Sequence, residues 1–124
     1  YTTLFRSLFI TADAHAMNVR FSDQAIRCRA TSAELQQLLT GRSLALELCL
    51  PRDRKFRISV RPAALETWQL ESDPTGIWVT IPRSQLELLA QALPRKEGIE
   101  HSFEAAEGSV LVSFEVDLRE PGQL

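Results

Sequence analysis

The sequence lacks several features that would place it in a known class of protein. It has no apolar run near the roughly 20 residues that a membrane-spanning helix needs, so no such helix is expected. It has only two cysteines, Cys28 and Cys49, and no CxxC pair, which argues against a zinc ribbon or a dithiol redox site. A disulfide between them is left open. Cys28 alternates with apolar residues as a small core residue does, so we expect reduced thiols and a cytoplasmic protein.

The motifs of the common enzyme classes are missing too. The sequence has no glycine-rich phosphate loop, no HExxH or GxSxG motif and no Cys/His cluster with zinc spacing. No catalytic residue, cofactor or metal site is therefore predicted. His101, the only histidine after Met17, lies between Ile99 and Phe103 on the apolar side of its segment. That position predicts a buried histidine bonded to the backbone rather than a general base.

The composition is that of one ordinary globular domain. The 124 residues are 44% hydrophobic and 24% charged, and the net charge of −2 calls for neither nucleic acid nor a membrane as a partner. The first seven residues, YTTLFRS, resemble the in-frame translation of a sequencing adaptor, as in a metagenomic library. We therefore expect a non-native or disordered leader over 1–16, one domain over 17–118 and a C-terminal tail over 119–124.

Most of the domain alternates apolar and polar residues with a period of two, which is typical of half-buried β-strands. In residues 55–61, for example, Phe56, Ile58 and Val60 alternate with three cationic residues and a serine. The pattern predicts eight strands, at residues 17–21, 25–30, 43–50, 55–61, 64–71, 76–81, 99–105 and 109–118.

Two segments instead repeat their apolar residues every three to four positions, which predicts helices. The first follows Thr31, which forms the pattern of a capping box with Glu34, and it ends at Gly41. The second begins near residue 83 and ends before Pro94. We expect both helices to pack on the apolar faces of the strands, in a core that includes Leu35, Leu38, Phe56, Ile58, Val60, Leu86, Leu89, Val112, Phe114 and Val116.

The order strand-strand-helix-strand-strand therefore occurs twice. Residues 26–40 and 77–91 align without gaps at an offset of 51, although only three of these fifteen positions are identical. We predict an α+β fold, a tandem ββαββ repeat of eight mainly antiparallel strands and two short helices. The strands could close into a barrel or form two packed sheets.

One stretch resembles a known family. Residues 17–35, MNVRFSDQAIRCRATSAEL, resemble the opening of a family of short bacterial proteins that is classed only as a domain of unknown function. The likeness continues through residues 77–82 (IWVTIP) to 114–118 (FEVDL). The chain departs from the family pattern at Asp23-Gln24 and at Val116. The resemblance implies the start and limits of the domain, and it implies no activity.

Charge is divided unevenly between the two halves. Residues 17–61 contain nine Lys/Arg and four Asp/Glu, whereas residues 62–124 contain four Lys/Arg and eleven Asp/Glu. Acidic residues concentrate on the last two predicted strands. Only if the charged faces lined the inside of a barrel would Glu115 and Asp117 hold a divalent metal through oxygen ligands. Basic residues of the second and fourth strands are candidates for anion binding: Arg27, Arg29, Lys55, Arg57 and Arg61.

Two interpretations of these charges compete. If the charged faces lined a barrel, the chain would be similar to the triphosphate-tunnel enzymes, metal-dependent phosphohydrolases with eight strands. If they face solvent, the apolar faces form the core. We favour the second, because two short helices could not cover the apolar faces of eight strands turned outward. We therefore expect a non-enzymatic binding or assembly module, which could form a homo-oligomer. Trp78 would be an interface residue or lie under a helix.

Overall fold

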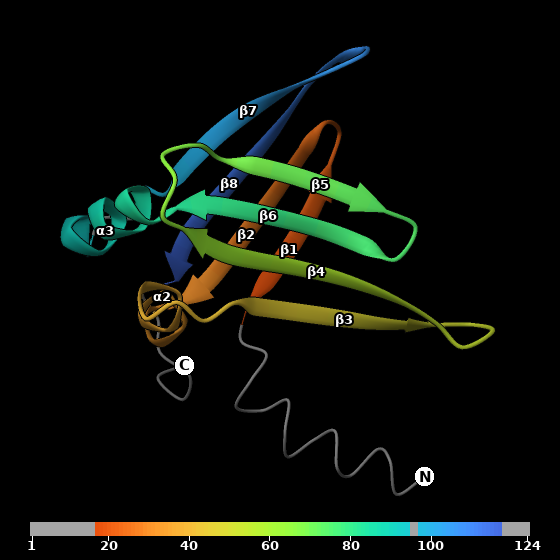
Figure 1. Ribbon diagram of the computed structural model, residues 1–124, viewed down its shortest axis with the longest axis horizontal. Coiled ribbons are helices and arrows are strands. Elements are labelled where there is room, and N and C mark those ends of the chain that lie inside the picture. The colour runs from red at the N-terminus through yellow and green to blue at the C-terminus, as the bar shows by residue number, and fades with distance from the viewer. Residues whose placement is uncertain (1–16, 95–96, 118–124) are drawn as a thin grey trace, which may run out of the picture.

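The eight strands form two separate four-stranded sheets, and both helices lie at one end of them (Figure 1). Sheet A has the order β1-β2-β8-β7 and sheet B the order β3-β4-β6-β5. The computed structural model describes residues 17–94 and 97–117, so the predicted leader and C-terminal tail lie outside the described residues. The elements are β1 (Asn18–Ser22), β2 (Ala25–Thr31), α2 (Ser32–Leu39), β3 (Leu44–Leu50), β4 (Arg54–Ala63), β5 (Gln69–Asp73), β6 (Gly76–Pro82), α3 (Arg83–Ala92), β7 (Ile99–Ala105) and β8 (Gly108–Asp117).

The predicted α+β class, with eight strands and two helices, is confirmed. Of the two arrangements left open, the structure has two sheets and no closed barrel among the described residues. Four pairings are antiparallel hairpins, whereas the central pairings β2–β8 and β4–β6 are parallel. Each sheet therefore joins a hairpin from the first half of the domain to a hairpin from the second half.

The two halves have the same order of strands and helices and the same kinds of strand pairing. β1 begins at Asn18 and β5 at Gln69, and β2 begins at Ala25 and β6 at Gly76, so both pairs are offset by 51 residues. The parallel pairings agree as well. β2 of the first half pairs with β8, the last strand of the second half, and β6 of the second half pairs with β4, the last strand of the first half. A position in sheet A therefore has an equivalent position in sheet B.

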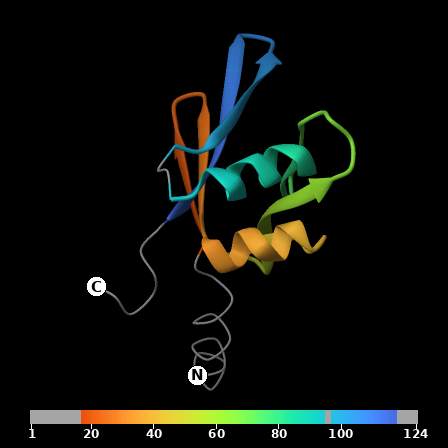
Figure 2. The same ribbon diagram turned by 90° about the vertical axis from the view of Figure 1, so that its left-hand side faces the viewer.

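The helix ends follow the sequence signals. Thr31 accepts a hydrogen bond from the backbone N–H of Glu34, and the Glu34 carboxylate accepts one from the backbone N–H of Thr31, which confirms the capping box. Gly41, at φ +97°, ends α2 in a left-handed conformation that glycine adopts without strain. α3 packs beside α2 (Figure 2). Neither described helix is long and apolar enough to span a membrane.

The core lies between the sheets and under the helices. Of the predicted core residues, Phe56 and Ile58 are only half-buried, and the others are buried: Leu35, Leu38, Val60, Leu86, Leu89, Val112, Phe114 and Val116. Burial of these side chains is the main favourable term for folding, at roughly 1.5–3 kcal/mol for each large one. The same alternation turns the charged side chains of β2, β4 and β8 to the outer faces of the sheets.

Two sequence predictions near the edge strands are wrong. The fifth strand begins at Gln69 rather than at residue 64, because β4 continues to Ala63 and the chain then bends. His101 faces the inner side of sheet A as predicted, but it is exposed because β7 is an edge strand. Its ring stacks on buried Trp68, with centroids 5.6 Å apart, and meets the edge of Phe103 at 4.8 Å. The histidine thus links sheet A to the loop before β5.

Candidate functional site

The candidate anion-binding residues do not converge on one site. Arg27 and Arg29 lie on β2 in sheet A, whereas Lys55, Arg57 and Arg61 lie on β4 in sheet B. All five have the parity of the outer faces, opposite to that of the core residues. The arrangement expected of a triphosphate tunnel, with these residues around one enclosed cavity, is therefore not formed by the described part of the chain.

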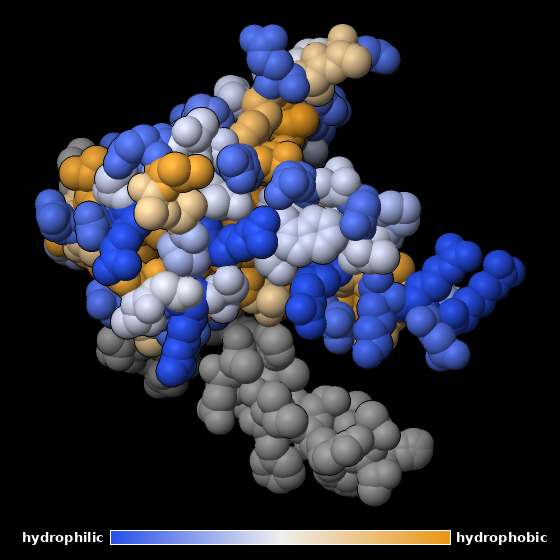
Figure 3. Space-filling view, viewed as in Figure 1, coloured by the Kyte–Doolittle hydropathy of each residue, from blue (hydrophilic) through white to orange (hydrophobic). Residues whose placement is uncertain are grey.

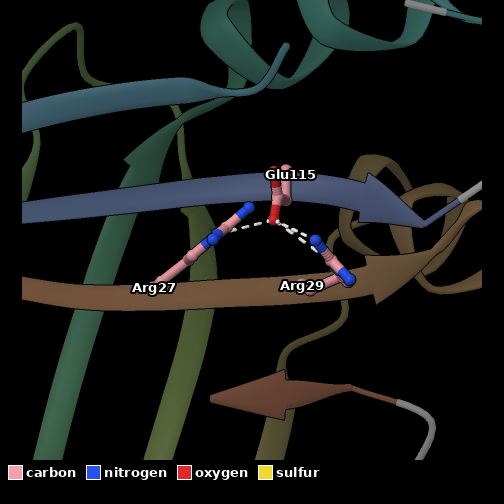
Figure 4. Close-up of polar contacts among 3 residues, drawn as sticks. All are labelled: Arg27, Arg29 and Glu115. Carbon is pink, nitrogen blue, oxygen red and sulfur yellow. Dashed lines mark hydrogen bonds and ion pairs between the residues drawn. The ribbon is translucent and has the colours of Figure 1, made fainter. Parts of the chain in front are cut away.

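Two of the candidates meet Glu115 of the neighbouring strand (Figure 4). The parallel β2–β8 pairing sets Arg29 directly beside Glu115. Arg27 donates from Nε to Glu115 Oε1 at 2.8 Å, and Arg29 donates to the same oxygen at 3.1 Å. One carboxylate oxygen thus holds two guanidinium groups in place.

The environment keeps Glu115 ionised. Its side chain is only 15% exposed, and this burial would by itself raise the pKa. Hydrogen bonds from Arg27 and Arg29 and their positive charges outweigh burial, so the pKa of Glu115 is lowered from its ordinary value. The bond to Glu115 in turn raises the pKa of Arg27. A carboxylate held in this way is suited to orienting arginines and poorly suited to proton transfer.

Sequence reasoning overlooked Arg20, which completes this group. Arg20 on β1 is the direct cross-strand partner of Arg27. The signal was present, because a two-residue turn between Ser22 and Ala25 closes the β1–β2 hairpin and sets the two arginines opposite each other. We call Arg20, Arg27, Arg29 and Glu115 the arginine cluster; together with Asn18 they line a hollow of about 10 Å³ on the outer face of sheet A, room for a single water-sized group.

The three candidates on sheet B are engaged in ordinary surface ion pairs. Lys55 Nζ and Arg57 Nη2 lie 3.9 and 3.4 Å from the two carboxylate oxygens of Glu47. Arg61 lies 3.4 Å from Glu71 and also donates to the Thr80 hydroxyl. These side chains are 37–65% exposed, and ion pairs of this kind contribute little to stability.

Glu115 and Asp117, the metal ligands expected only of a triphosphate-tunnel enzyme, do not form a recognisable metal centre in the described part of the chain. Glu115 already accepts hydrogen bonds from two arginines, and Asp117 lies two positions further along β8, beside Thr31. Within residues 17–94 and 97–117, no group of three or more His, Cys, Asp and Glu residues is arranged to hold a metal ion.

Trp78 lies on the outer face of sheet B, as its polar parity predicts, and is half-buried. Its cross-strand neighbours are Ser59 on β4 and Glu71 on β5. At an offset of 51, Trp78 is the position equivalent to Arg27 in sheet A. Its neighbour Ser59 is 7% exposed even though it lies on the outer face.

A second feature is the open end of the sheets, opposite the helices (Figure 1). Along the inner face of β3, exposure rises from 5% at Leu44 through half-buried Leu46 to 59% at Leu48, and Leu50 is 41% exposed. Phe21, on the inner face of β1, is 55% exposed. Figure 1 shows that the strands of the two sheets run in different directions away from the helices, and the apolar side chains at their far ends are exposed.

Comparison with known proteins gives a family but no activity. A family model described as a family of unknown function (DUF7009) matches residues 17–119. The match begins at the predicted first residue of the domain, Met17, and ends one residue beyond the predicted limit. No curated protein matches the chain.

Proposed function

We propose that this chain, which belongs to the family of unknown function DUF7009, is a non-enzymatic assembly module that associates with further copies of itself. The observation that supports the proposal is the open end of the sheets, where core-facing apolar side chains reach solvent. A soluble domain ordinarily buries such residues. An exposed apolar surface bordered by charged residues is typical of a protein–protein contact.

Apolar surface is available on both sheets. On sheet B it is formed by Leu48 and Leu50 of β3 and by half-buried Phe56 of β4. On sheet A, Phe103 of β7 and Val110 of β8 are half-buried cross-strand partners on the inner face. Figure 3 shows apolar surface on the part of sheet A that extends beyond β5.

The two hairpins that carry these residues have opposite charge. Residues 44–63, the β3–β4 hairpin, contain five Lys/Arg and two Asp/Glu, whereas residues 99–117, the β7–β8 hairpin, contain five Asp/Glu and no Lys/Arg. Two copies of the same hairpin would repel each other, whereas β3–β4 of one copy attracts β7–β8 of another. This complementarity favours a head-to-tail contact between unlike hairpins, with a second copy of the chain as the partner.

The apolar area at each hairpin is modest, so the association should be weak. Complete burial of a Leu or Phe side chain contributes roughly 1.5–3 kcal/mol. Association costs at least about 4 kcal/mol in lost translational and rotational freedom. A few partly exposed side chains per contact therefore support self-association that depends on protein concentration.

Sedimentation velocity over a range of protein concentrations tests the proposal. The wild-type chain should form species larger than the monomer as concentration rises, and Leu48→Asp should remain monomeric under the same conditions. Leu88→Asp is the matched control, because Leu88 is 56% exposed but lies on α3, away from the open end. The control should self-associate as the wild type does.

Charge reversal tests which hairpins meet. Lys55→Glu and Glu104→Lys should each weaken self-association, and mixing the two variants should restore it, because the altered hairpins are again complementary. A wild-type chain that stays monomeric at every concentration would overturn the proposal. So would a Leu88→Asp variant that is disrupted as strongly as Leu48→Asp.

A further inference from the structure

The arginine cluster carries more positive charge than its own structure neutralises. Arg20 and Arg27 lie directly opposite each other on β1 and β2, and Arg29 follows two residues along β2. Like charges in directly opposed positions destabilise a strand pairing. Glu115 pairs with Arg27 and Arg29, whereas no acidic side chain of residues 17–94 and 97–117 pairs with Arg20. The cluster therefore has three guanidinium groups and one carboxylate, and only two of the three pair with it.

The fold itself does not require this excess charge. On the outer face of sheet B, the positions equivalent to Arg20, Arg27, Arg29 and Glu115 are occupied by Glu71, Trp78, Thr80 and Arg61. One of these side chains is acidic, one is basic and two are uncharged. Arg61 donates to Glu71 and to Thr80 within this set, which is electrically balanced. Because the same strand pairing forms there with balanced charge, the three arginines of sheet A need a reason other than folding.

The geometry of the cluster leaves donor groups for a ligand. Arg27 uses Nε to reach Glu115, so its two terminal nitrogens remain available (Figure 4). Arg20 is exposed on β1 and borders the same hollow, and the Asn18 side chain at its rim is a further donor. Arg29 is 33% exposed, and it uses Nε and Nη2 to hold Glu115.

We propose that the hollow between Arg20 and Arg27 binds an oxyanion group, a phosphate or a carboxylate of a small multivalent anion. Arg20 and Arg27 provide the charge-assisted hydrogen bonds. Glu115, which Arg29 also contacts, is the positioning residue that holds the Arg27 side chain through its Nε. The planar fork of guanidinium suits two-point contact with both kinds of oxyanion. The site lies on the outer face of sheet A and does not depend on self-association through the inner faces.

Binding is tested with tripolyphosphate and with citrate, each titrated at low ionic strength into the full chain and followed by NMR shifts of the backbone and arginine Nε–H groups. At least one of the two anions should bind saturably, with shifts at Arg20, Arg27 and neighbouring positions of sheet A. Whichever anion binds more tightly identifies the group as phosphate or carboxylate. Saturable binding of neither anion would overturn the proposal.

Charge variants distinguish binding at the arginine cluster from non-specific electrostatic attraction of the anion to the protein surface. Arg20→Gln should weaken binding about fivefold or more, since a hydrogen bond to a charged group is lost. Arg57→Gln, which removes the same charge from the outer face of sheet B, should leave the affinity within about twofold. Equal losses in the two variants would show non-specific attraction and overturn the site. Arg27→Gln provides a second test at the cluster should Arg20→Gln fold poorly, and it should weaken binding in the same way.

Discussion

Arg29 and Glu115 are direct partners across the parallel β2–β8 pairing, and Arg29 Nη2 lies 3.1 Å from Glu115 Oε1. These two residues are 86 positions apart in the sequence, and each comes from a different half of the domain. Their contact therefore shows how the two halves are joined in sheet A: β2, the second strand of the first half, pairs with β8, the last strand of the second half. The contact also makes the stability of the domain depend on pH.

The stability that the Glu115 ion pairs contribute to the folded domain should be lost in acid. The pKa of Glu115 is lower in the folded state than its ordinary value of 4.5, so the ion pairs contribute fully above that pH and are lost as pH falls through the folded pKa. Glu115→Gln should cost about 1–2 kcal/mol at pH 7. Urea unfolding at neutral pH and in acid measures the difference, which should shrink towards zero well below pH 4.5. A difference that stays constant would show that Glu115 acts by packing rather than by charge.

Core and surface positions of the two sheets should respond very differently to truncation. Phe114 is fully buried, so Phe114→Ala should destabilise the domain by roughly 3–5 kcal/mol through the cavity that it leaves. The Arg57 side chain is 55% exposed, so Arg57→Ala should change the free energy of unfolding by less than about 1 kcal/mol. Denaturant unfolding of both variants checks the ranking. The reverse order would mean that the charged faces are turned inward.

The two cysteines should differ sharply in reactivity. Cys28 is 1% exposed, and burial raises the pKa of its thiol to about 12, whereas Cys49 is exposed on β3. Because the thiolate is the reactive form, a disulfide reagent should label one thiol rapidly in the native protein and the second only after unfolding. Cys49→Ser should abolish the rapid phase. Rapid labelling of both thiols would show that β2 is not packed in the core.

Gly76 should be intolerant of any side chain. A Cβ at this position would collide with the backbone carbonyl of Arg57 on the neighbouring strand, so Gly76→Ala should destabilise the domain by about 2 kcal/mol or more. Gly41 provides the comparison, because it has open space around it and only its positive φ resists a side chain. Gly41→Ala should therefore cost about 1 kcal/mol. Thermal unfolding of the two variants measures which substitution destabilises the domain more. Equal losses of stability would show that the β4–β6 pairing can relax around the new side chain.

The alternation of apolar and polar residues predicts which face of its strand each site residue occupies. It does not predict which of these residues lie together. Alternation along β2 and β8 is enough to place Arg27, Arg29 and Glu115 on a charged face. The same reasoning groups Arg27 and Arg29 with Lys55, Arg57 and Arg61, which the structure places on another sheet. Parity assigns a side chain to a face of its own strand and contains no information on which strand lies beside it. For the same reason, the sequence leaves the barrel and the two sheets as equal alternatives.

Local features follow from the sequence alone: the strand and helix order, the capping box at Thr31, the turns, and the apolar side of each strand. These depend on interactions within a few residues, which the local pattern contains. Only tertiary packing places β2 beside β8, separates the sheets at their open end, and leaves His101 and Leu48 exposed although both lie on apolar faces. Such outcomes depend on how two twisted sheets cross and on which surface each still covers, and that balance is set by the packing of the whole domain.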